Sequence, residues 1–371
     1  MKMKTWCAAM ATSVLFLGAA QAQSYIYKDL TPDTGGVARA INNKGQIVGS
    51  SYIAGVGVHA TLWSVSTSTG LGSLGPNGSA ARAINGNGQT VGYSMFPSSV
   101  LTATTWDTAT GTAHALASGV ASNAKAINTA GQIAGNTTAE DGSSTATIWS
   151  GNRTTYLATL GGNGAATGIN DHGLVVGNTY LDGGELVHAT VWNGKGVSEL
   201  GTLGGAGSDA EAVNNNGRIV GASQRVDGSW QATLWNGDKI TNLGAPGNDG
   251  GQAWAINNRD QVVGYTYGDT NINSRTWRAT LWDGGRMIDL NNFLDSDSRE
   301  AGWVLTQAYG INDNGAIVGE AINFLTSSRH AFMLSVSAVP EPTTYVSLLF
   351  GLACLAMVNG RRNWRREKKR A

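Results

Sequence analysis

The sequence has little cysteine, proline or charge. Its 371 residues include two cysteines and six prolines, and charged residues make up 13%. The cysteines, Cys7 and Cys354, lie near the two ends, so we expect no disulfide, thiol nucleophile or cysteine metal site in the body of the chain. Glycine is abundant instead, with 52 residues, and it disfavours helices by about 1 kcal/mol relative to alanine. This composition favours an all-β fold with many tight turns.

The 25 basic and 25 acidic residues are unevenly distributed along the chain. Nine basic but only two acidic residues lie in residues 1–22 and 338–371, which leaves the body with 16 basic and 23 acidic residues and a net charge of −7. Binding to a phosphate backbone depends on clustered lysine and arginine. We therefore expect no nucleic acid partner.

Residues 1–22 are typical of a secretory signal peptide. Lys2 and Lys4 precede an apolar stretch over residues 7–20, and an Ala-Gln-Ala cleavage site ends the segment. We expect the chain to be exported and the mature protein to begin at Gln23.

Residues 338–371 combine a Val-Pro-Glu-Pro tetrapeptide, an apolar run from Thr343 to Gly360 and a basic tail. As a helix, the run would extend about 27 Å, close to the roughly 30 Å of a membrane core, and the basic tail would stay cytoplasmic. A plain single-span anchor would have these properties.

The order of these parts resembles the PEP-CTERM sorting signal of Gram-negative bacteria. The resemblance implies recognition by exosortase, a membrane protease-transpeptidase, with an intermediate anchored in the inner membrane and a final place at the cell surface or in the extracellular matrix. The residues that carry it are Val339, Pro340, Glu341, Pro342, Arg361, Arg362, Arg365 and Arg366.

One unit repeats seven times through the body. It contains Ala-x-Ala-Ile-Asn or a close variant, followed in six copies by Ala-Thr-x-Trp and in the seventh by the degenerate stretch 330–334. Because six of the 12 tryptophans share one place in the repeat, we interpret them as packing residues. The repeated asparagines are Asn42, Asn85, Asn128, Asn170, Asn214, Asn257 and Asn312, separated by 43, 43, 42, 44, 43 and 55 residues.

Each unit is predicted to contain four short strands. In the first unit, Ala-x-Ala-Ile forms one strand, an Asn-x-x-Gly turn ending at Gly45 leads to a second, and the stretch from His59 to Trp63 forms a third. Four strands in about 43 residues is the spacing of a propeller blade. We predict a seven-bladed β-propeller over residues 23–337.

The two ends of the repeat array complement each other. The last unit lacks a fourth strand after Leu334, whereas a spare strand from Tyr25 to Leu30 precedes the first unit. This N-terminal strand can complete the seventh blade and cover an edge that would invite aggregation. Such complementarity favours a closed ring over an open solenoid, which would need caps.

The units also resemble the HAF repeat of bacterial extracellular proteins, over about residues 30 to 336. The name-giving tripeptide occurs literally only at His330-Ala331-Phe332, while the Ala-Ile-Asn and Gly-x-Ile-Val-Gly elements recur through the array. The resemblance implies an extracellular repeat protein and carries no activity or catalytic residue with it.

The residue between the two small residues of Ala-x-Ala differs from unit to unit. If the N-terminal strand is the outermost strand of its blade, the Ala-x-Ala strand is the innermost. Seven innermost strands converge on the axis, so only alanine or glycine fits on either side of the variable residue. Constant small residues around one variable residue are expected at a channel mouth that has diversified for binding. Exposed positions under no selection would vary in the same way. The candidates are Arg39, Arg82, Lys125, Glu211, Trp254 and Tyr309, with Thr167 in the fourth unit.

The strongest break in the repeat is the 55-residue spacing around the sixth unit. The additional residues include Arg275, Trp277, Arg278 and Trp303. The aromatic rings could stack on a sugar, and the arginines could hydrogen-bond to it. An irregular connection that needs no ligand is equally compatible with the insertion.

The sequence predicts no catalytic constellation, metal site or cofactor. His59, His188 and His330 occupy the same place in different blades, so rotation about the axis keeps them apart. Asp209 and Glu211 are a pair of carboxylates, but two residues apart in one strand is a common arrangement.

These observations predict a noncatalytic exported surface or matrix protein whose propeller binds glycan or protein, with extracellular polysaccharide or a surface protein as partner. The alternatives are a purely structural spacer in the polysaccharide matrix and, less favoured, a propeller enzyme acting on polysaccharide.

Overall fold

The computed structural model describes residues 24–64, 67–116, 121–181, 186–194, 196–245, 249–268 and 276–337. The signal peptide and the sorting segment expected at the two ends lie outside these residues, and so does the transmembrane helix expected over residues 343–360. No helix among the described residues has the length and apolar character needed to cross a membrane. Residues 25–336 form one compact unit, and the description below concerns that unit.

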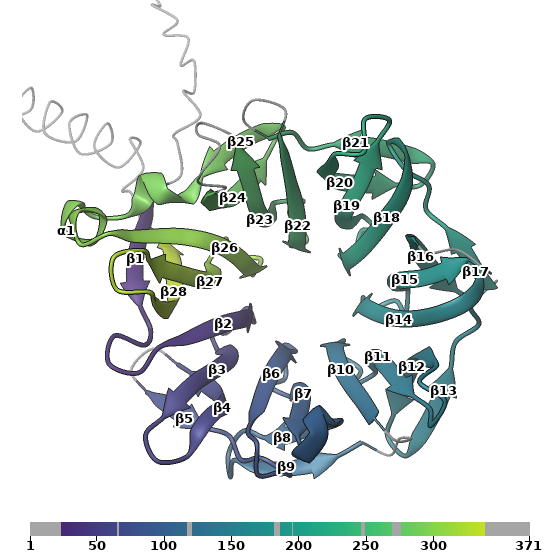
Figure 1. Ribbon diagram of the computed structural model, residues 1–371, viewed down its shortest axis with the longest axis horizontal. Helices are drawn as coiled ribbons and strands as arrows, with labels where there is room; N and C mark the ends of the chain where they lie inside the picture. Colours follow the sequence, from purple (N-terminus) through teal and green to yellow (C-terminus); the bar gives the residue numbers. More distant parts are fainter. Residues whose placement is uncertain are drawn as a thin grey trace, which may run out of the picture. The chain divides into compact units, whose positions relative to one another are not determined.

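Seven antiparallel four-stranded sheets surround a central axis, as Figure 1 shows. The prediction of a seven-bladed β-propeller is therefore confirmed. The strands of each blade are given from the innermost to the outermost. The first blade contains β2 (Gly36–Ile41), β3 (Ile47–Ile53), β4 (Gly57–Trp63) and β5 (Ser68–Gly70), and the second contains β6 (Ser79–Ile84), β7 (Thr90–Met95), β8 (Leu101–Asp107) and β9 (Thr112–Ala115). The third contains β10 (Ala121–Ile127), β11 (Ile133–Thr138), β12 (Ser144–Ser150) and β13 (Arg153–Tyr156), and the fourth contains β14 (Gly161–Ile169), β15 (Val175–Leu181), β16 (Val187–Asn193) and β17 (Gly196–Glu199). The other three are β18 (Gly204–Val213), β19 (Ile219–Arg225), β20 (Trp230–Asn236) and β21 (Lys239–Asn242); β22 (Gly250–Ile256), β23 (Val262–Gly268), β24 (Thr276–Asp283) and β25 (Arg286–Asp289); and β26 (Trp303–Ile311), β27 (Ile317–Asn323), β28 (Ser328–Val336) and β1 (Tyr25–Asp29).

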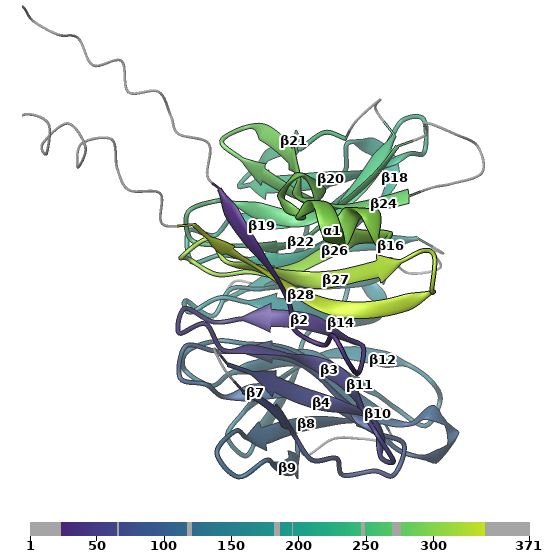
Figure 2. The ribbon, with the colours of Figure 1, turned by 90° about the vertical axis from the view of Figure 1, so that its left-hand side faces the viewer.

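The N-terminal strand closes the seventh blade, as predicted. β1 pairs with β28 along its whole length, from Tyr25 opposite Val336 to Asp29 opposite Phe332. The purple β1 lies beside the yellow β28 in Figure 2. Asp29 Oδ2 also lies 2.6 Å from Nδ1 of His330. The two ends of the array are therefore joined both by backbone pairing and by a side-chain contact.

A β-bulge interrupts every innermost strand inside Ala-x-Ala. In β2, Ala38 lies opposite Gly49 and Ala40 opposite Val48, which leaves Arg39 as the extra residue. A bulge re-aims the side chain of that residue. It also explains the repeated glycine of the second strand, because a Cβ at Gly49 would overlap the carbonyl oxygen of Val37. The same register shift recurs in the other six blades, at residues 81–83, 124–126, 166–168, 210–212, 253–255 and 308–310.

The repeated asparagines form a closed belt where the innermost strands end. In the first blade, the side-chain oxygen of Asn42 accepts from the backbone N–H groups of Lys44 and Gln46, which fixes the turn. Its Nδ2 donates to the backbone oxygen of Asn85 in the next blade. Seven such inter-blade bonds, 2.9 to 3.1 Å long, run around the ring and end with Asn312 donating to Asn42.

The repeated tryptophans are wedged between blades, which confirms their interpretation as packing residues. Trp106 of the second blade packs in one core cluster with Val48 and Leu71 of the first. Its Nε1 donates to the backbone oxygen of Gly72, 2.7 Å away. In the seventh blade Leu334 takes this place, since it pairs with Ile317 as Trp63 pairs with Ile47. The six tryptophans are Trp63, Trp106, Trp149, Trp192, Trp235 and Trp282, all buried.

The long connection from β25 to β26 belongs to the core. It contains a short 3₁₀ helix, η3 (Leu290–Phe293), and one helical turn, α1 (Ser296–Glu300). Leu290 and Leu294 are buried, and Phe293 packs edge-on against Tyr25 of the closing strand with ring centroids 4.9 Å apart. This part of the insertion thus supports the seam between the first and last strands. Another short 3₁₀ helix among the described residues, η1 (Pro97–Ser99), precedes β8.

Candidate functional site

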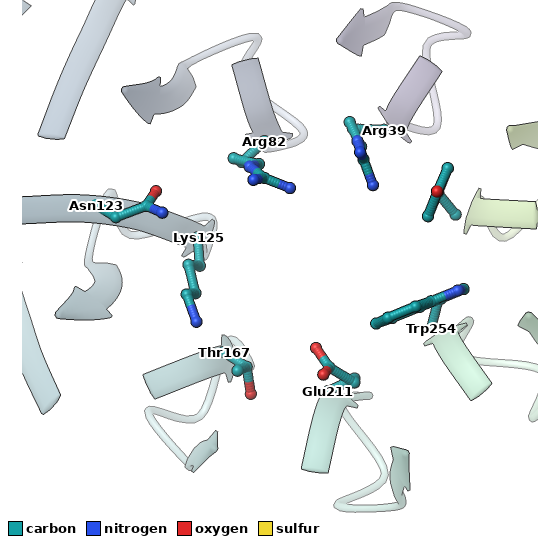
Figure 3. Close-up of a pocket in the computed structure, with 8 residues that line it drawn as sticks. Arg39, Arg82, Asn123, Lys125, Thr167, Glu211 and Trp254 are labelled. Carbon is teal, nitrogen blue, oxygen red and sulfur yellow. The ribbon is translucent and has the colours of Figure 1, made fainter. Parts of the chain in front are cut away.

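The bulge residues of the seven blades converge on one axial cavity of about 380 Å³, here called the axial mouth. Their labelled side chains extend into it from separate blades in Figure 3. The structure therefore brings together all six residues predicted from the variable position of Ala-x-Ala. The lining consists of Arg39, Arg82, Lys125, Thr167, Glu211, Trp254 and Tyr309, together with Asn123.

The charges around the axial mouth are arranged in two halves. Blades one to three contribute Arg39, Arg82 and Lys125, whereas blades five to seven contribute Glu211, Trp254 and Tyr309. One side of the cavity is therefore cationic and the other is acidic and aromatic. This asymmetry arises from substitutions at one position of an otherwise regular repeat, and it needs no insertion.

Aromatic rings continue from the axial mouth outward along the sixth blade. Trp254 lies 5.9 Å from Tyr309 and 6.1 Å from Tyr265, measured between ring centroids, and Tyr265 lies 5.5 Å from Trp277. Tyr265 thus links a bulge residue to the exposed Trp277. It was missed in the sequence because it lies on the second strand, directly after the repeated glycine.

The two carboxylates of β18, Asp209 and Glu211, are held together by one amide. Gln252 Nε2 donates to Asp209 Oδ1 at 3.1 Å and to Glu211 Oε1 at 3.4 Å. Asp209 Oδ1 also accepts from the backbone N–H of Ala222. Burial raises the pKa of Asp209 to about 6. Burial and then the neighbouring Asp209 raise the pKa of Glu211 to about 8, so Glu211 holds its proton at neutral pH.

The cations are also poorly hydrated. Burial lowers the pKa of Lys125, and the nearby Glu211 partly opposes this effect. Burial and the like charge of Arg39 lower the pKa of Arg82. Both guanidinium groups lie against tyrosine rings: Cζ of Arg39 is 4.0 Å from the ring centroid of Tyr309, and Cζ of Arg82 is 5.3 Å from that of Tyr93.

Three buried polar atoms at the axial mouth lack a hydrogen-bond partner. They are Nε of Arg82, Oδ1 of Asn123 and Nε1 of Trp254. Among the described residues, the only other such side-chain atom is the hydroxyl oxygen of Tyr25. Because an unpaired buried polar atom costs about 1–3 kcal/mol, their concentration at one cavity distinguishes it from the rest of the fold.

The residues predicted at the insertion make separate contacts. Trp277 is 43% exposed on β24, next to Arg278, whose guanidinium lies 3.3 Å from Asp289. Trp303 is half-buried, packs against the core and lies 4.2 Å from the ring of His330. No ring contact joins Trp277 to Trp303 in the described part of the chain. The structure gives Trp303 a packing contact, and Arg275 lies outside the described residues.

The belt of asparagines lines a second axial cavity of about 290 Å³, where the innermost strands end. Asn85 illustrates how its polar groups are used. Its Oδ1 accepts from the N–H groups of Asn87 and Gln89, and its Nδ2 donates to Asn128 and to the side chain of Gln89. These bonds leave little capacity for a ligand, in contrast with the axial mouth.

Two of the three histidines that share one place in the repeat contact carboxylates of their own blades. His188 Nδ1 is 2.8 Å from Glu199, and His330 Nδ1 is 2.6 Å from Asp29. Within the described ranges, no three His, Cys, Asp or Glu side chains lie close enough together to hold a metal ion.

No protein-family model and no curated protein matches this sequence. A puromycin-hydrolysing peptidase of Mycobacterium tuberculosis has a similar structure, with 11% identity, a TM-score of 0.51 and coverage of 83% of this chain and 55% of that one. TolB from Acinetobacter baumannii is 12% identical with a TM-score of 0.45, covering 82% and 64%. The SapL1 lectin, in complex with alpha methyl fucoside, is 14% identical with a TM-score of 0.40, covering 71% and 97%.

The chain spans 55% of the length of the peptidase and 64% of the length of TolB. At these identities, structural similarity shows the fold alone.

Proposed function

We propose that this protein is a noncatalytic exported surface or matrix protein whose axial mouth binds a glycan. The observation that carries the proposal is the cluster of three unpartnered polar atoms, on Arg82, Asn123 and Trp254, at a single cavity. Buried polar groups in native proteins find partners in ligands or ordered water. A ligand with several hydroxyl groups supplies such partners without any rearrangement of the backbone.

The axial mouth combines the two features that sugar binding needs. The rings of Trp254 and Tyr309 offer apolar faces for the C–H face of a sugar, and the polar side chains around them can hydrogen-bond its hydroxyls. A volume of about 380 Å³ is at the small end of ligand pockets. It suits the end or a branch of a polysaccharide better than a long internal segment.

The carboxylate pair supports binding rather than hydrolysis. Glycosidases need one carboxylate free to donate a proton and another free to attack or activate water. Here Gln252 donates to both Asp209 and Glu211, and Asp209 is further held by the N–H of Ala222. These bonds engage the two carboxyl groups with the scaffold. We assign Glu211, which lines the cavity, to ligand positioning.

Export and sorting are part of the proposal. Their support is the order of segments in the sequence: a signal peptide at residues 1–22 and the tetrapeptide, apolar run and basic tail in residues 338–371. Changing Pro340, Glu341 and Pro342 to alanine in an exosortase-bearing host should leave a longer, membrane-retained protein. An identical mature mass for the variant and the wild type would contradict recognition of this motif.

Glycan binding can be tested with the mature chain from Gln23 onward, in detergent, on immobilised polysaccharide of the host. Trp254→Ala should lower retention at least several-fold without unfolding the protein, because the residue is only partly buried and lines the cavity. Tyr156→Ala removes an exposed aromatic ring from the outermost strand β13 and should leave retention unchanged. If the wild type is not retained by any polysaccharide, the spacer function is favoured instead.

A further inference from the structure

We infer that the glycan bound at the axial mouth carries a carboxylate, as a terminal or branching uronic acid does. This inference rests on the proposed function and specifies its ligand. It is based on two sides of one cavity of about 380 Å³. Blades one to three form a cationic side, and blades six and seven form an aromatic side.

The charge at the axial mouth is opposite in sign to that of the body around it. Residues 23–337 carry 16 basic and 23 acidic residues. The lining nevertheless has three basic residues, Arg39, Arg82 and Lys125, and one acidic residue, Glu211. The cluster of cations attracts an anion to the axial mouth, and the acidic remainder of the protein repels it from other parts of the surface.

Two of the cations are held in position before a ligand arrives. The guanidinium of Arg39 stacks on Tyr309, and that of Arg82 lies over Tyr93. Stacking on a ring face leaves the edge of the guanidinium, with its N–H donors, available for other partners. The unpartnered Nε of Arg82 is such a donor. A carboxylate accepts two parallel N–H bonds from one guanidinium, which a neutral hydroxyl cannot do.

The remaining groups suit a sugar ring attached to that carboxylate. The ring of Trp254 extends into the cavity from the sixth blade in Figure 3, and its buried Nε1 also lacks a partner. Asn123, on the cationic side, offers an unpartnered oxygen that accepts from a hydroxyl. A simple inorganic anion would satisfy Arg82 but would leave Trp254 and Asn123 without partners, so an acidic sugar fits the complete set.

The inference can be tested by calorimetric titration of the mature chain, in detergent, with trigalacturonate and with a neutral glucose trisaccharide. The acidic trisaccharide should bind about tenfold more tightly or better, because charge-assisted hydrogen bonds are stronger than neutral ones. Arg82→Gln should reduce binding of trigalacturonate about tenfold and binding of the neutral sugar by a clearly smaller factor, because only the acidic sugar loses a charge-assisted pair of hydrogen bonds. The matched control is Arg153→Gln, at an exposed arginine of β13, which should alter neither affinity more than twofold.

The outcomes separate this inference from the proposed function. Equal binding of both trisaccharides, lowered for both by Trp254→Ala, would keep the glycan-binding function and overturn the acidic ligand. Tighter binding of a sulfated trisaccharide would overturn the carboxylate in particular. Binding of no glycan at all would overturn the proposed function as well. If Arg82→Gln does not fold, Arg82→Lys replaces it: the charge remains but the paired donors are lost, so the preference for trigalacturonate should still fall several-fold.

Discussion

The guanidinium of Arg39 lies over the ring of Tyr309, with Cζ 4.0 Å from the ring centroid. These residues are 270 positions apart and come from the first and seventh blades, so their contact spans the place where the ring closes. The hydroxyl of Tyr309 also donates to Glu320 Oε2 at 3.4 Å. Closure therefore connects the stability of the ring to the shape of the axial mouth.

The contact between Arg39 and Tyr309 should be measurable as a coupling energy. We expect a double-mutant cycle with Arg39→Ala and Tyr309→Ala, followed by urea denaturation, to give about 0.5–2 kcal/mol, the range of partly desolvated cation–π pairs. A pair without a ring contact, Arg39 and Tyr180, provides the control and should give additive effects. Additivity for Arg39 and Tyr309 as well would contradict the stacking.

Loss of the closing strand should expose an edge of the seventh blade. A chain that begins at Thr31 lacks β1 and leaves the backbone groups of β28 unpaired. We expect it to unfold at lower temperature or to form oligomers, as measured by thermal denaturation and light scattering. A truncated protein that remained monomeric with an unchanged melting midpoint would count against the importance of closure.

Asn85→Asp should destabilise the fold although the two side chains have nearly the same shape. The substitution keeps an oxygen for the turn but replaces the Nδ2 donor, which bonds the backbone oxygen of Asn128, with a charged acceptor. We expect a loss of about 1–3 kcal/mol in the free energy of unfolding. Asn87→Asp breaks an exposed bond to the backbone oxygen of Thr129 and should cost less. Equal losses for the two variants would show that the buried inter-blade bond stabilises the fold no more than the exposed one.

Glu211 should make the protein less stable as pH rises. Its ordinary pKa of 4.5 is raised to about 8 in the folded state, mainly by burial. Between these values the folded protein binds more protons than the unfolded chain, so the free energy of unfolding falls with increasing pH. Glu211→Gln should flatten this decrease, whereas the exposed Glu300→Gln should preserve it. Urea denaturation at pH 5 and pH 8.5 measures both slopes, and parallel slopes for wild type and Glu211→Gln would contradict the raised pKa.

The loss of stability on truncating a tryptophan to alanine should depend on how deeply that tryptophan is buried. Trp192 is 4% exposed between two blades, and its truncation to alanine should cost about 3–5 kcal/mol. Trp303 packs against the core and should also lower the melting temperature when truncated. Trp277 is 43% exposed and should have a small effect. Thermal denaturation of the three variants checks this order, and a loss for Trp277→Ala as large as that for Trp192→Ala would contradict it.

Much of the ring could be predicted from sequence because the repeat encodes it locally. The spacing of Asn42 and its six counterparts fixes the number of blades, and the spare strand beginning at Tyr25 indicates how the last blade is completed. The residues of the axial mouth followed from the same repeat, since variation inside a fixed frame marks a shared position on the axis. In each case, one copy could be compared with six others.

Features that depend on contacts between blades could not be predicted in this way. Asn42 was interpreted as a turn residue, which it is, but its bond to Asn85 exists only once the blades are packed side by side. The sequence leaves the insertion around the sixth unit open as a ligand site or an irregular connection, whereas Leu290 and Phe293 place its second half in the core. Tyr265 was missed because the second strand was expected only to pair.

The bulges of the innermost strands separate recognition from folding. The carbonyl oxygens, small residues and glycines that form each bulge also hold the sheet together, whereas the side chain of the extra residue, such as Arg39, Lys125 or Trp254, takes no part in the ladder. Seven positions, one in each blade, therefore supply most of the lining of the axial mouth, to which Asn123 also contributes. Substitutions at these seven positions change which groups face the axis while the backbone pairing of the blades stays the same.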